Sequence, residues 1–203
     1  MTITYHGIRG QGRLASREGR ETGTTVSANQ DTLASELSVE PGTQVLLSVS
    51  SMQSPLDRLP ASACRNLVVV SSASPGDIAE RLTARGIDLR TVALIPISGA
   101  DHEYEGPMWT CDPLVPDDLT GLSMRLSRAF EALGDGGGTL LVENLNVFLL
   151  YADESRVVRF LDHVTGLAAD HGISGVYAVV GDAVDEETYN RIAASVDSAI
   201  DCA

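Results

Sequence analysis

Lysine is missing from the sequence. All 14 basic residues are arginine, and 28 aspartate and glutamate residues outnumber them, so the formal net charge at pH 7 is −14. The absence of lysine excludes any site that is built around an ammonium group. The excess of negative charge repels the phosphates of nucleic acids and anionic membrane surfaces. We therefore expect no direct binding to either.

Paired cysteines and long apolar segments are also missing. The three cysteines, Cys64, Cys111 and Cys202, lie far apart and lack the spacing of a zinc site, a redox motif or a disulfide framework. No apolar run approaches the ~20 residues that cross a membrane. The arginines near the N-terminus have no apolar segment behind them, unlike those of a signal peptide. We expect a cytoplasmic protein with free thiols and no bound cofactor.

The acidic composition suits concentrated salt. Dissolved ions screen charges that are separated by more than ~3 Å at 1 M salt, which removes most of the self-repulsion of an acidic surface. An acidic protein from which lysine has been eliminated is typical of extremely halophilic archaea. We predict such a source, which carries no functional information by itself.

The first 27 residues differ from the rest of the chain. They are rich in glycine, serine, threonine and arginine and show no hydrophobic period. We predict that residues 1–27 form a disordered or loosely attached basic arm and that residues 28–203 form one domain. The arm could contact an acidic partner or the acidic surface of its own domain, or it could have no role. Association with DNA through the arm is a further alternative.

Strands and helices alternate along the domain. Apolar segments predict strands at residues 43–49, 66–71, 91–97, 139–143 and 175–180. Helical patterns cover residues 74–85, 116–133 and 153–171, and a last helix begins at residue 185 and extends through Ile200; a short loop is expected between residues 143 and 153. This order predicts a three-layer α/β fold whose mainly parallel sheet has five or more strands and helices on both faces.

In such a sheet, ligands bind outside the carboxyl ends of the strands. A phosphate-binding loop after the first strand would read G-x-x-x-x-G-K-[ST]. Residues 48–55 read SVSSMQSP instead: Ser48 and Gln53 stand at the glycine positions, Ser54 at the lysine and Pro55 at the hydroxyl residue. Pro55 also lacks the backbone N–H that the loop would donate. An intact phosphate-binding loop is therefore excluded.

Glu143 ends the fourth predicted strand, where an acidic residue holds magnesium in nucleotide hydrolases. Two interpretations stay open. Glu143 could be a structural carboxylate that bonds to neighbouring groups. Alternatively, it could contact a metal or a ribose, while Ser50, Ser51 and Ser54 donate hydrogen bonds to a nucleotide or another small molecule. In the second interpretation, these four residues form a vestigial nucleotide site.

The remaining polar candidates favour structural roles. Asn144 and Asn146 follow the strand and are expected to make turn hydrogen bonds. His163 and His171 lie eight residues apart on a predicted helix and are expected to be solvated, with His171 at the favourable negative end of the helix dipole. Trp109 lies in an acidic loop, where it could anchor a partner but is more simply explained as a cover for the sheet.

The second half of the chain resembles a known family. The segment LLVENLNVFLLYADESRVVRFLDHVTGLAADHGISGVYAVVGDAVDEETYN is similar to the Walker B half of the archaeal RecA-like, KaiC-type ATPase-related proteins, and in particular to a haloarchaeal branch that lacks a functional P-loop. Glu143-Asn144 replaces the Asp-Ser of that group, whereas Leu149-Leu150-Tyr151 and Arg159-Phe160-Leu161 match it. The segment PDDLTGLSMRLSRAFEAL resembles the D-L-T helix that precedes this strand. The resemblance covers residues 44–200.

The resemblance implies a degenerate RecA-like core, of a kind found in signalling and in the regulation of motility and gas vesicles. Catalytic residues have no matching positions, so no ATPase activity is carried over. We therefore expect a non-catalytic pseudo-ATPase that acts in regulation through protein contacts, with a paralogous RecA-like ATPase or a second copy of itself as partner. The alternative is residual binding of a nucleotide or small molecule at the strand ends, without efficient hydrolysis.

Overall fold

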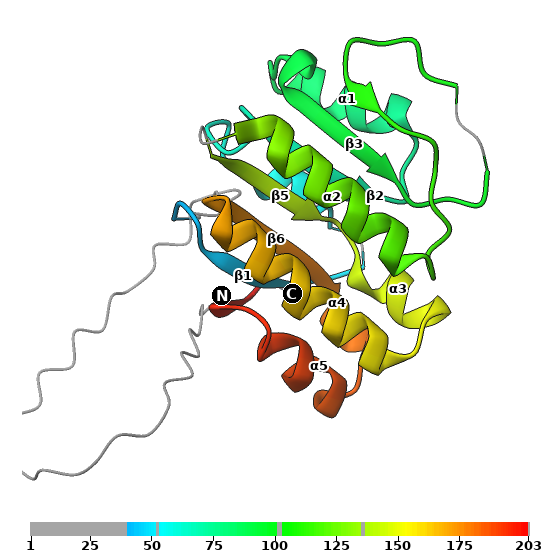
Figure 1. The fold of residues 1–203 in the computed structure, drawn as a ribbon, viewed down its shortest axis with the longest axis vertical. Coiled ribbons are helices and arrows are strands. Elements are labelled where there is room, and N and C mark those ends of the chain that lie inside the picture. The colour runs from blue at the N-terminus through cyan, green and yellow to red at the C-terminus, as the bar shows by residue number, and fades with distance from the viewer. Residues whose placement is uncertain (1–39, 52, 101–102, 135–136, 203) are drawn as a thin grey trace, which may run out of the picture.

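The computed structural model describes residues 40–51, 53–100, 103–134 and 137–202, so the predicted arm of residues 1–27 lies outside it. Within these residues a seven-stranded sheet has the order β4-β3-β2-β5-β6-β1-β7. Every pairing between neighbouring strands is parallel. Figure 1 shows the sheet between helices that lie in front of it and behind it. The predicted three-layer α/β fold is confirmed.

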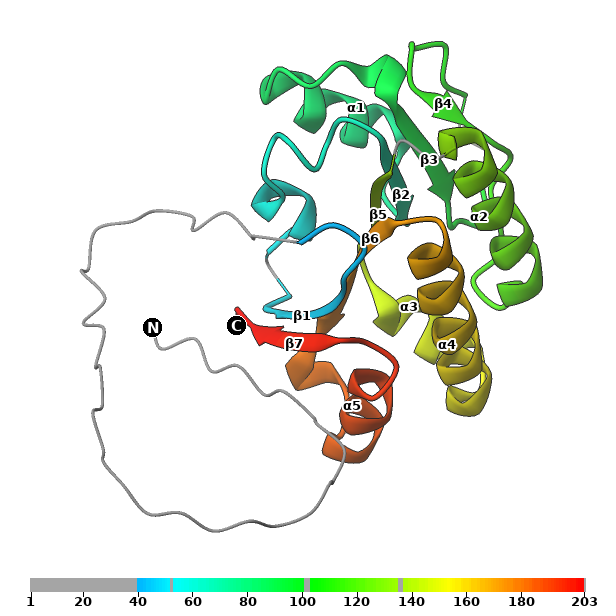
Figure 2. The ribbon, with the colours of Figure 1, turned by 60° about the vertical axis from the view of Figure 1, so that its left-hand side comes forward.

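All five predicted strands are present at nearly the predicted bounds. They are β1 (Gln44–Val49), β2 (Leu67–Ser71), β3 (Val92–Pro96), β5 (Gly138–Val142) and β6 (Ile173–Val180). Two short strands that the patterning misses, β4 (Trp109–Thr110) and β7 (Ser198–Asp201), form opposite edges of the sheet (Figure 2). Neither is long enough to show an apolar pattern of its own.

Most of the helices begin where a polar side chain bonds to a free backbone N–H group. The four longer ones are α1 (Pro75–Ala84), α2 (Leu119–Leu133), α4 (Glu154–Asp170) and α5 (Glu186–Ala193). Ser74, Asp118 and Asp185 accept hydrogen bonds from the N–H groups three residues further on, which stabilises the first turns of α1, α2 and α5. In the part of the chain that the structure describes, no helix is long and apolar enough to cross a membrane.

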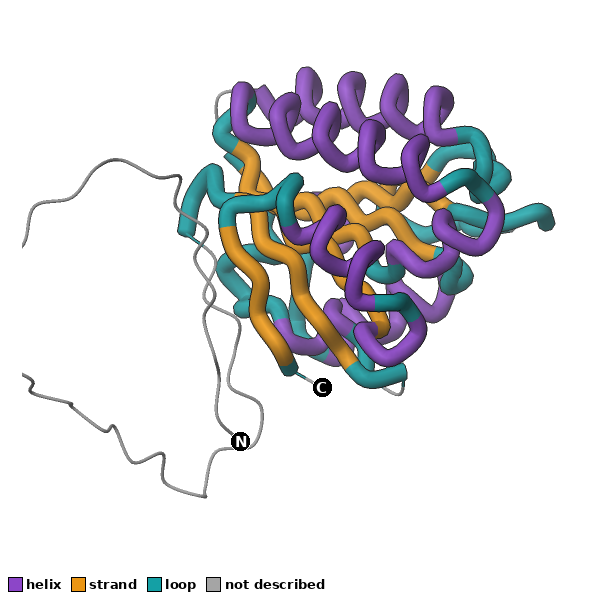
Figure 3. Tube along the Cα trace, turned by 90° about the horizontal axis from the view of Figure 1, so that it is seen from below, coloured by secondary structure: helices purple, strands orange, loops and turns teal. Residues whose placement is uncertain are grey.

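The sheet separates two hydrophobic cores. Leu46 of β1 packs into the core beneath α2, α4 and α5, whereas its neighbours Val45 and Leu47 face the core on the side of α1. Figure 3 shows helices on both sides of the strands. Because successive side chains of a strand point to opposite faces and both faces are covered, the central strands are apolar at nearly every position.

The prediction of a loop between residues 143 and 153 is wrong. Residues Leu145–Tyr151 form a further helix, α3. The side chains of Leu145 and Phe148 form the buried face of this helix. The ring centroids of Phe148 and of Phe160 in α4 lie 5.9 Å apart. The segment LNVFLLY has only two turns and almost no polar residues, so no helical period is visible in it. Packing against α4 and β6 decides its conformation.

The last predicted helix is too long. Helix α5 ends at Ala193, and Ile200, which was expected on its apolar face, lies in β7. Strand β7 pairs with β1, and the backbone N–H groups of Asp197 and Cys202 donate to the carbonyl oxygens of Gln44 and Ser48. The unpaired edge of β1 offers hydrogen bonds that no local pattern reveals. This pairing overrides the helical spacing of the apolar residues.

A buried hydrogen-bonded pair joins β1 to β6. The hydroxyl of Tyr177 donates to Gln44 Oε1 at 2.8 Å, and Gln44 Nε2 donates to the carbonyl of Ile173 at 2.9 Å. Burial raises the pKa of Tyr177, and the negative charge of Asp197 raises it further, so the phenol stays a neutral donor. Gly175 makes room for the pair, since a Cβ atom at this position would lie 2.1 Å from Gln44 Oε1.

The substitution Gly175→Ala is expected to lower the free energy of unfolding by about 1–3 kcal/mol, because the added methyl group displaces the pair from its place in the core. Gly166→Ala in α4 is the matched control, since its Cβ would meet nothing within 4 Å. The control is expected to raise the stability by about 0.5–1 kcal/mol through helix propensity. Urea denaturation in the same salt measures both, and equal stabilities for the two variants would contradict the prediction.

Candidate functional site

The carboxylate of Glu143 lies directly after β5, at the carboxyl end of the sheet, and its side chain is only 10% exposed. Ser54 Oγ donates to Glu143 Oε1 at 2.9 Å, and Ser71 Oγ donates to Oε2. Arg81 Nη1 of α1 lies 3.8 Å from Oε1, and Nη2 of the same guanidinium lies 2.7 Å from Asp57 Oδ2. Groups of this chain therefore engage both oxygens of the Glu143 carboxylate.

The loop after β1 is fastened to α1. It contains the four-residue 3-10 helix η1 (Pro55–Arg58), which starts with proline and has no side-chain cap. Arg85, the residue that follows the end of α1, donates to the carbonyl oxygens of Leu56 and Leu59. The side chains of these two leucines are fully buried. Packing and hydrogen bonds thus hold the loop against the body of the domain.

Two of the four predicted site residues are in contact. Ser54 bonds to Glu143, as described above. Ser50 is half-buried and Ser51 is exposed, and their side chains form no hydrogen bond within the described residues. The structure therefore brings Ser54 and Glu143 together but does not join the two earlier serines to them. A role of the four residues in ligand binding stays a prediction.

Two further residues at this site, Ser71 and Arg81, were not among the predicted site residues. The position of Ser71 could be anticipated, because β2 and β5 are parallel neighbours and Ser71 ends β2 beside the end of β5. The position of Arg81 could not be anticipated in this way, because it lies in the last turn of α1 and not at the end of a strand. Its contact with Glu143 depends on how α1 packs on the sheet.

Asn144 and Asn146 make local hydrogen bonds. Asn144 Oδ1 accepts a bond from the backbone N–H of Asn146 at 2.9 Å and caps α3. The amide of Asn146 forms two bonds to Val180 at the end of β6: its Nδ2 donates to the carbonyl at 3.3 Å and its Oδ1 accepts from the N–H at 2.8 Å. These bonds tie the start of α3 to β6, in agreement with the predicted structural role.

Metal ligation has no support in the described ranges, where no group of three or more His, Cys, Asp or Glu side chains is placed to hold an ion. His171 follows the end of α4, with Nδ1 2.9 Å from the carbonyl oxygen of Leu167, and His163 is exposed. Cys64 is buried, and burial raises the pKa of its thiol. A thiol of raised pKa is a poor nucleophile and a poor metal ligand at neutral pH.

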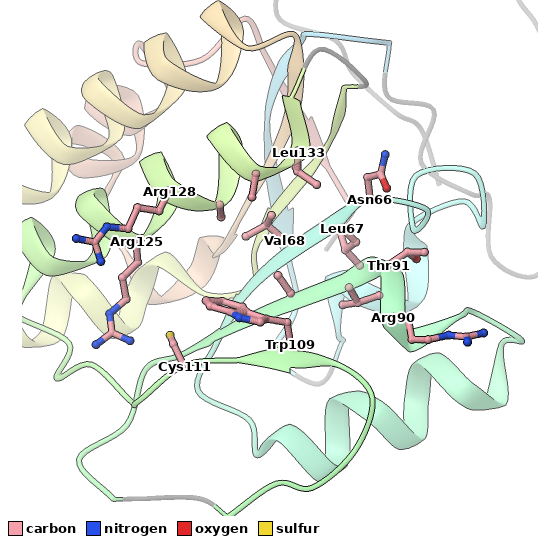
Figure 4. A pocket seen from close by; sticks show the side chains of 14 residues that line it. Asn66, Leu67, Val68, Arg90, Thr91, Trp109, Cys111, Arg125, Arg128 and Leu133 are labelled. Carbon is pink, nitrogen blue, oxygen red and sulfur yellow. The ribbon is translucent and has the colours of Figure 1, made fainter.

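Two cavities of different size lie at opposite ends of the central strands. At the carboxyl end, a cavity lined in part by Ser71 and Asn144 has a volume of only about 10 Å³. A cavity of about 580 Å³ lies at the other end, where β2 and β3 begin beside α2. Its lining includes Val68, Ala93, Trp109, Arg125, Arg128 and Leu133 (Figure 4). The larger volume lies within the ~300–1,000 Å³ of typical ligand pockets.

Comparison with a solved structure defines the class of the fold. The crystal structure of a KaiC-like protein from the hyperthermophilic archaeon Pyrococcus horikoshii OT3 is similar, with a TM-score of 0.54 and 12% sequence identity over 80% of this chain and 72% of that chain. At this identity the similarity shows the fold alone. The predicted RecA-like, KaiC-like core is thereby confirmed as a fold.

The family is defined by sequence. A model described as a family of unknown function, DUF7504, matches residues 42–202, and the chain belongs to this family. No match was found among curated proteins. The predicted haloarchaeal source and the predicted loss of P-loop function stay predictions.

The residues at the carboxyl end do not fit the magnesium–nucleotide complex that is associated with this fold. A triphosphate needs a lysine and several free backbone N–H groups, commonly at the start of a helix. The chain contains no lysine. The segment after β1 forms the short, proline-initiated η1, and the carboxylate of Glu143 is already paired with Arg81 and two serines.

The contacts of Glu143 predict its contribution to stability. Glu143→Ala is expected to reduce the free energy of unfolding by about 2 kcal/mol, since it leaves the hydroxyl groups of Ser54 and Ser71 without the acceptor that they share. Glu131→Ala is the control, because Glu131 is exposed on α2 and forms no ion pair with the described residues. A change within about 0.5 kcal/mol is expected there. Urea denaturation checks both values, and an equally small effect at Glu143 would refute the structural role.

Proposed function

We propose that this chain is a non-catalytic RecA/KaiC-like module that acts in regulation or signalling through contacts with other proteins, in the cytoplasm of a halophilic archaeon. The observation that carries the proposal is the arrangement around Glu143. The carboxylate at the position of the catalytic metal ligand serves instead as an anchor for Ser54, Ser71 and Arg81. The same contacts hold the loop that would otherwise surround a phosphate.

Exposed apolar side chains support a function in protein contacts. Leu150 and Tyr151, at the end of α3, are 77% and 61% exposed, and Val115, before α2, is 52% exposed. Arg156 in the first turn of α4 donates to the carbonyl oxygen of Asp117 at 3.1 Å, so the segment before α2 lies beside the start of α4, which directly follows α3. Large exposed apolar groups are unfavourable in water and are typical of contact surfaces.

A paralogous RecA-like ATPase or a second copy of this chain is the partner that we favour. RecA-like domains commonly assemble side by side, and a subunit without its own catalytic groups can still contribute a surface to such an assembly. The excess of acidic residues is compatible with this function in concentrated salt, where repulsion between two acidic subunits is screened.

Titration with ATP and Mg²⁺ in high salt is expected to show neither a heat of binding nor a shift of the melting temperature that corresponds to a dissociation constant below about 100 µM. An ATPase with an intact P-loop, titrated in the same buffer, serves as the positive control. Tighter binding to this chain would contradict the proposal. It would favour the alternative function, which is residual nucleotide binding without efficient hydrolysis.

The double substitution Leu150→Ser/Tyr151→Ser is expected to abolish the association of the protein with its partner, because the contact loses two large apolar groups. Affinity purification from the source organism in molar salt, combined with light scattering of the pure protein, detects either partner. Met124→Ser is the control, since Met124 is another exposed apolar residue and lies within α2. An association that survives the double substitution would exclude α3 as the contact.

A further inference from the structure

The 580 Å³ cavity is independent of the carboxyl end of the sheet and of the contacts of Glu143. Its floor is formed by the first residues of β2 and β3, and one wall is the face of α2 that carries Ala129, Ala132 and Leu133. Val68 and Ala93 contribute apolar surface from the strands. The cavity therefore offers an apolar surface of ligand size that no side chain of the described residues fills.

The charge that surrounds this cavity is opposite to that of the chain. Among the described residues, three arginines and no carboxylate line it, although acidic residues outnumber arginines 28 to 14 in the sequence. Arg90 is paired with Asp88, but Arg125 and Arg128 form no ion pair within the described ranges. Figure 4 shows Arg125 and Arg128 at one end of the cavity and Arg90 at the other.

The two arginines of α2 are available to a ligand. Arg125 Nη1 donates to the carbonyl oxygen of Asp112 at 2.6 Å, which holds the guanidinium in place and leaves its other N–H groups free to donate. Arg128 makes no hydrogen bond with any described residue. Guanidinium groups bind carboxylates and phosphates through paired hydrogen bonds, so two of them beside an apolar surface define a receptor for an apolar anion.

We propose that this cavity binds a small organic acid, with its apolar body against Val68, Ala129 and Leu133 and its carboxylate or phosphate group at Arg125 and Arg128. The volume fits a molecule of this size. Trp109 from β4 covers one side and is itself 53% exposed, which leaves an entrance from solvent. The bound ligand buries part of the indole and neutralises two charges that have no carboxylate partner among the described residues.

Trp109 provides a direct test, because it is the only tryptophan in the chain. Sodium octanoate is expected to change the fluorescence of Trp109 in a saturable way at constant salt. Octyl phosphate, titrated in parallel, distinguishes a preference for phosphate from one for carboxylate. The uncharged 1-octanol is expected to bind at least about tenfold more weakly than the better of the two anions, since it lacks the charge-assisted hydrogen bonds.

Three variants separate the contributions of the Arg128 charge, of the cavity volume and of the net charge to ligand binding. Arg128→Gln is expected to weaken the binding of the anion about tenfold and to leave 1-octanol unaffected. Ala132→Leu fills the cavity from α2 without a change of charge and is expected to abolish the binding of all three probes. Arg159→Gln, on the exposed face of α4, makes the same change of charge elsewhere and is expected to have no effect. Circular dichroism verifies that each variant is folded.

Three outcomes would overturn the proposal. The first is the absence of a saturable signal from either anion below about 10 mM, which corresponds to a binding free energy too small for a built site. The second is binding of 1-octanol as tight as that of the anions. The third is an equal loss of affinity in Arg128→Gln and Arg159→Gln, which would assign the effect to net charge alone. Nucleotide binding at Glu143 would not alter the result.

Discussion

The pairing of one largely buried carboxylate fixes the carboxyl end of this domain. A charge in such a place is stable only with an opposite charge and hydrogen-bond donors close by. Glu143 obtains these from Arg81, Ser54 and Ser71, which belong to α1, the loop after β1 and the end of β2. The position of the loop therefore depends on the same contacts. A phosphate at this end would have to compete with groups that the protein already uses for its own stability.

This arrangement separates the fold from the chemistry that the fold usually carries. The parallel sheet, the crossover helices and the two cores depend on apolar side chains, whereas phosphate binding depends on a few polar groups in one loop. Here the apolar framework is complete, and the loop contains η1 with the buried residues Pro55 and Leu56. The proposed function as a contact surface needs only this framework, because a packed 3-10 turn after β1 leaves both cores unchanged.

The amino end of the sheet shows the opposite arrangement. There the strands begin beside α2 without a side chain that fills the space, and Arg125 and Arg128 lie beside it without a carboxylate partner among the described residues. In a chain of net charge −14, such a region attracts anions that the remaining surface repels. A ligand in this cavity would contact α2 and β4, which lie apart from the proposed contact residues of α3.

The sequence by itself determined the central strands, the helix starts at Ser74, Asp153 and Asp185, and the absence of a lysine-dependent site, because apolar runs, helix-start residues and composition are local properties. It also indicated that Ser54 and Glu143 belong to one place. Only the tertiary structure decided that residues 198–201 form a strand, that Arg81 reaches Glu143 and that Trp109 lines a cavity. These features arise from the unpaired edge of β1 and from the packing of α1 and α2. They join residues far apart in the chain, and no local pattern encodes such contacts.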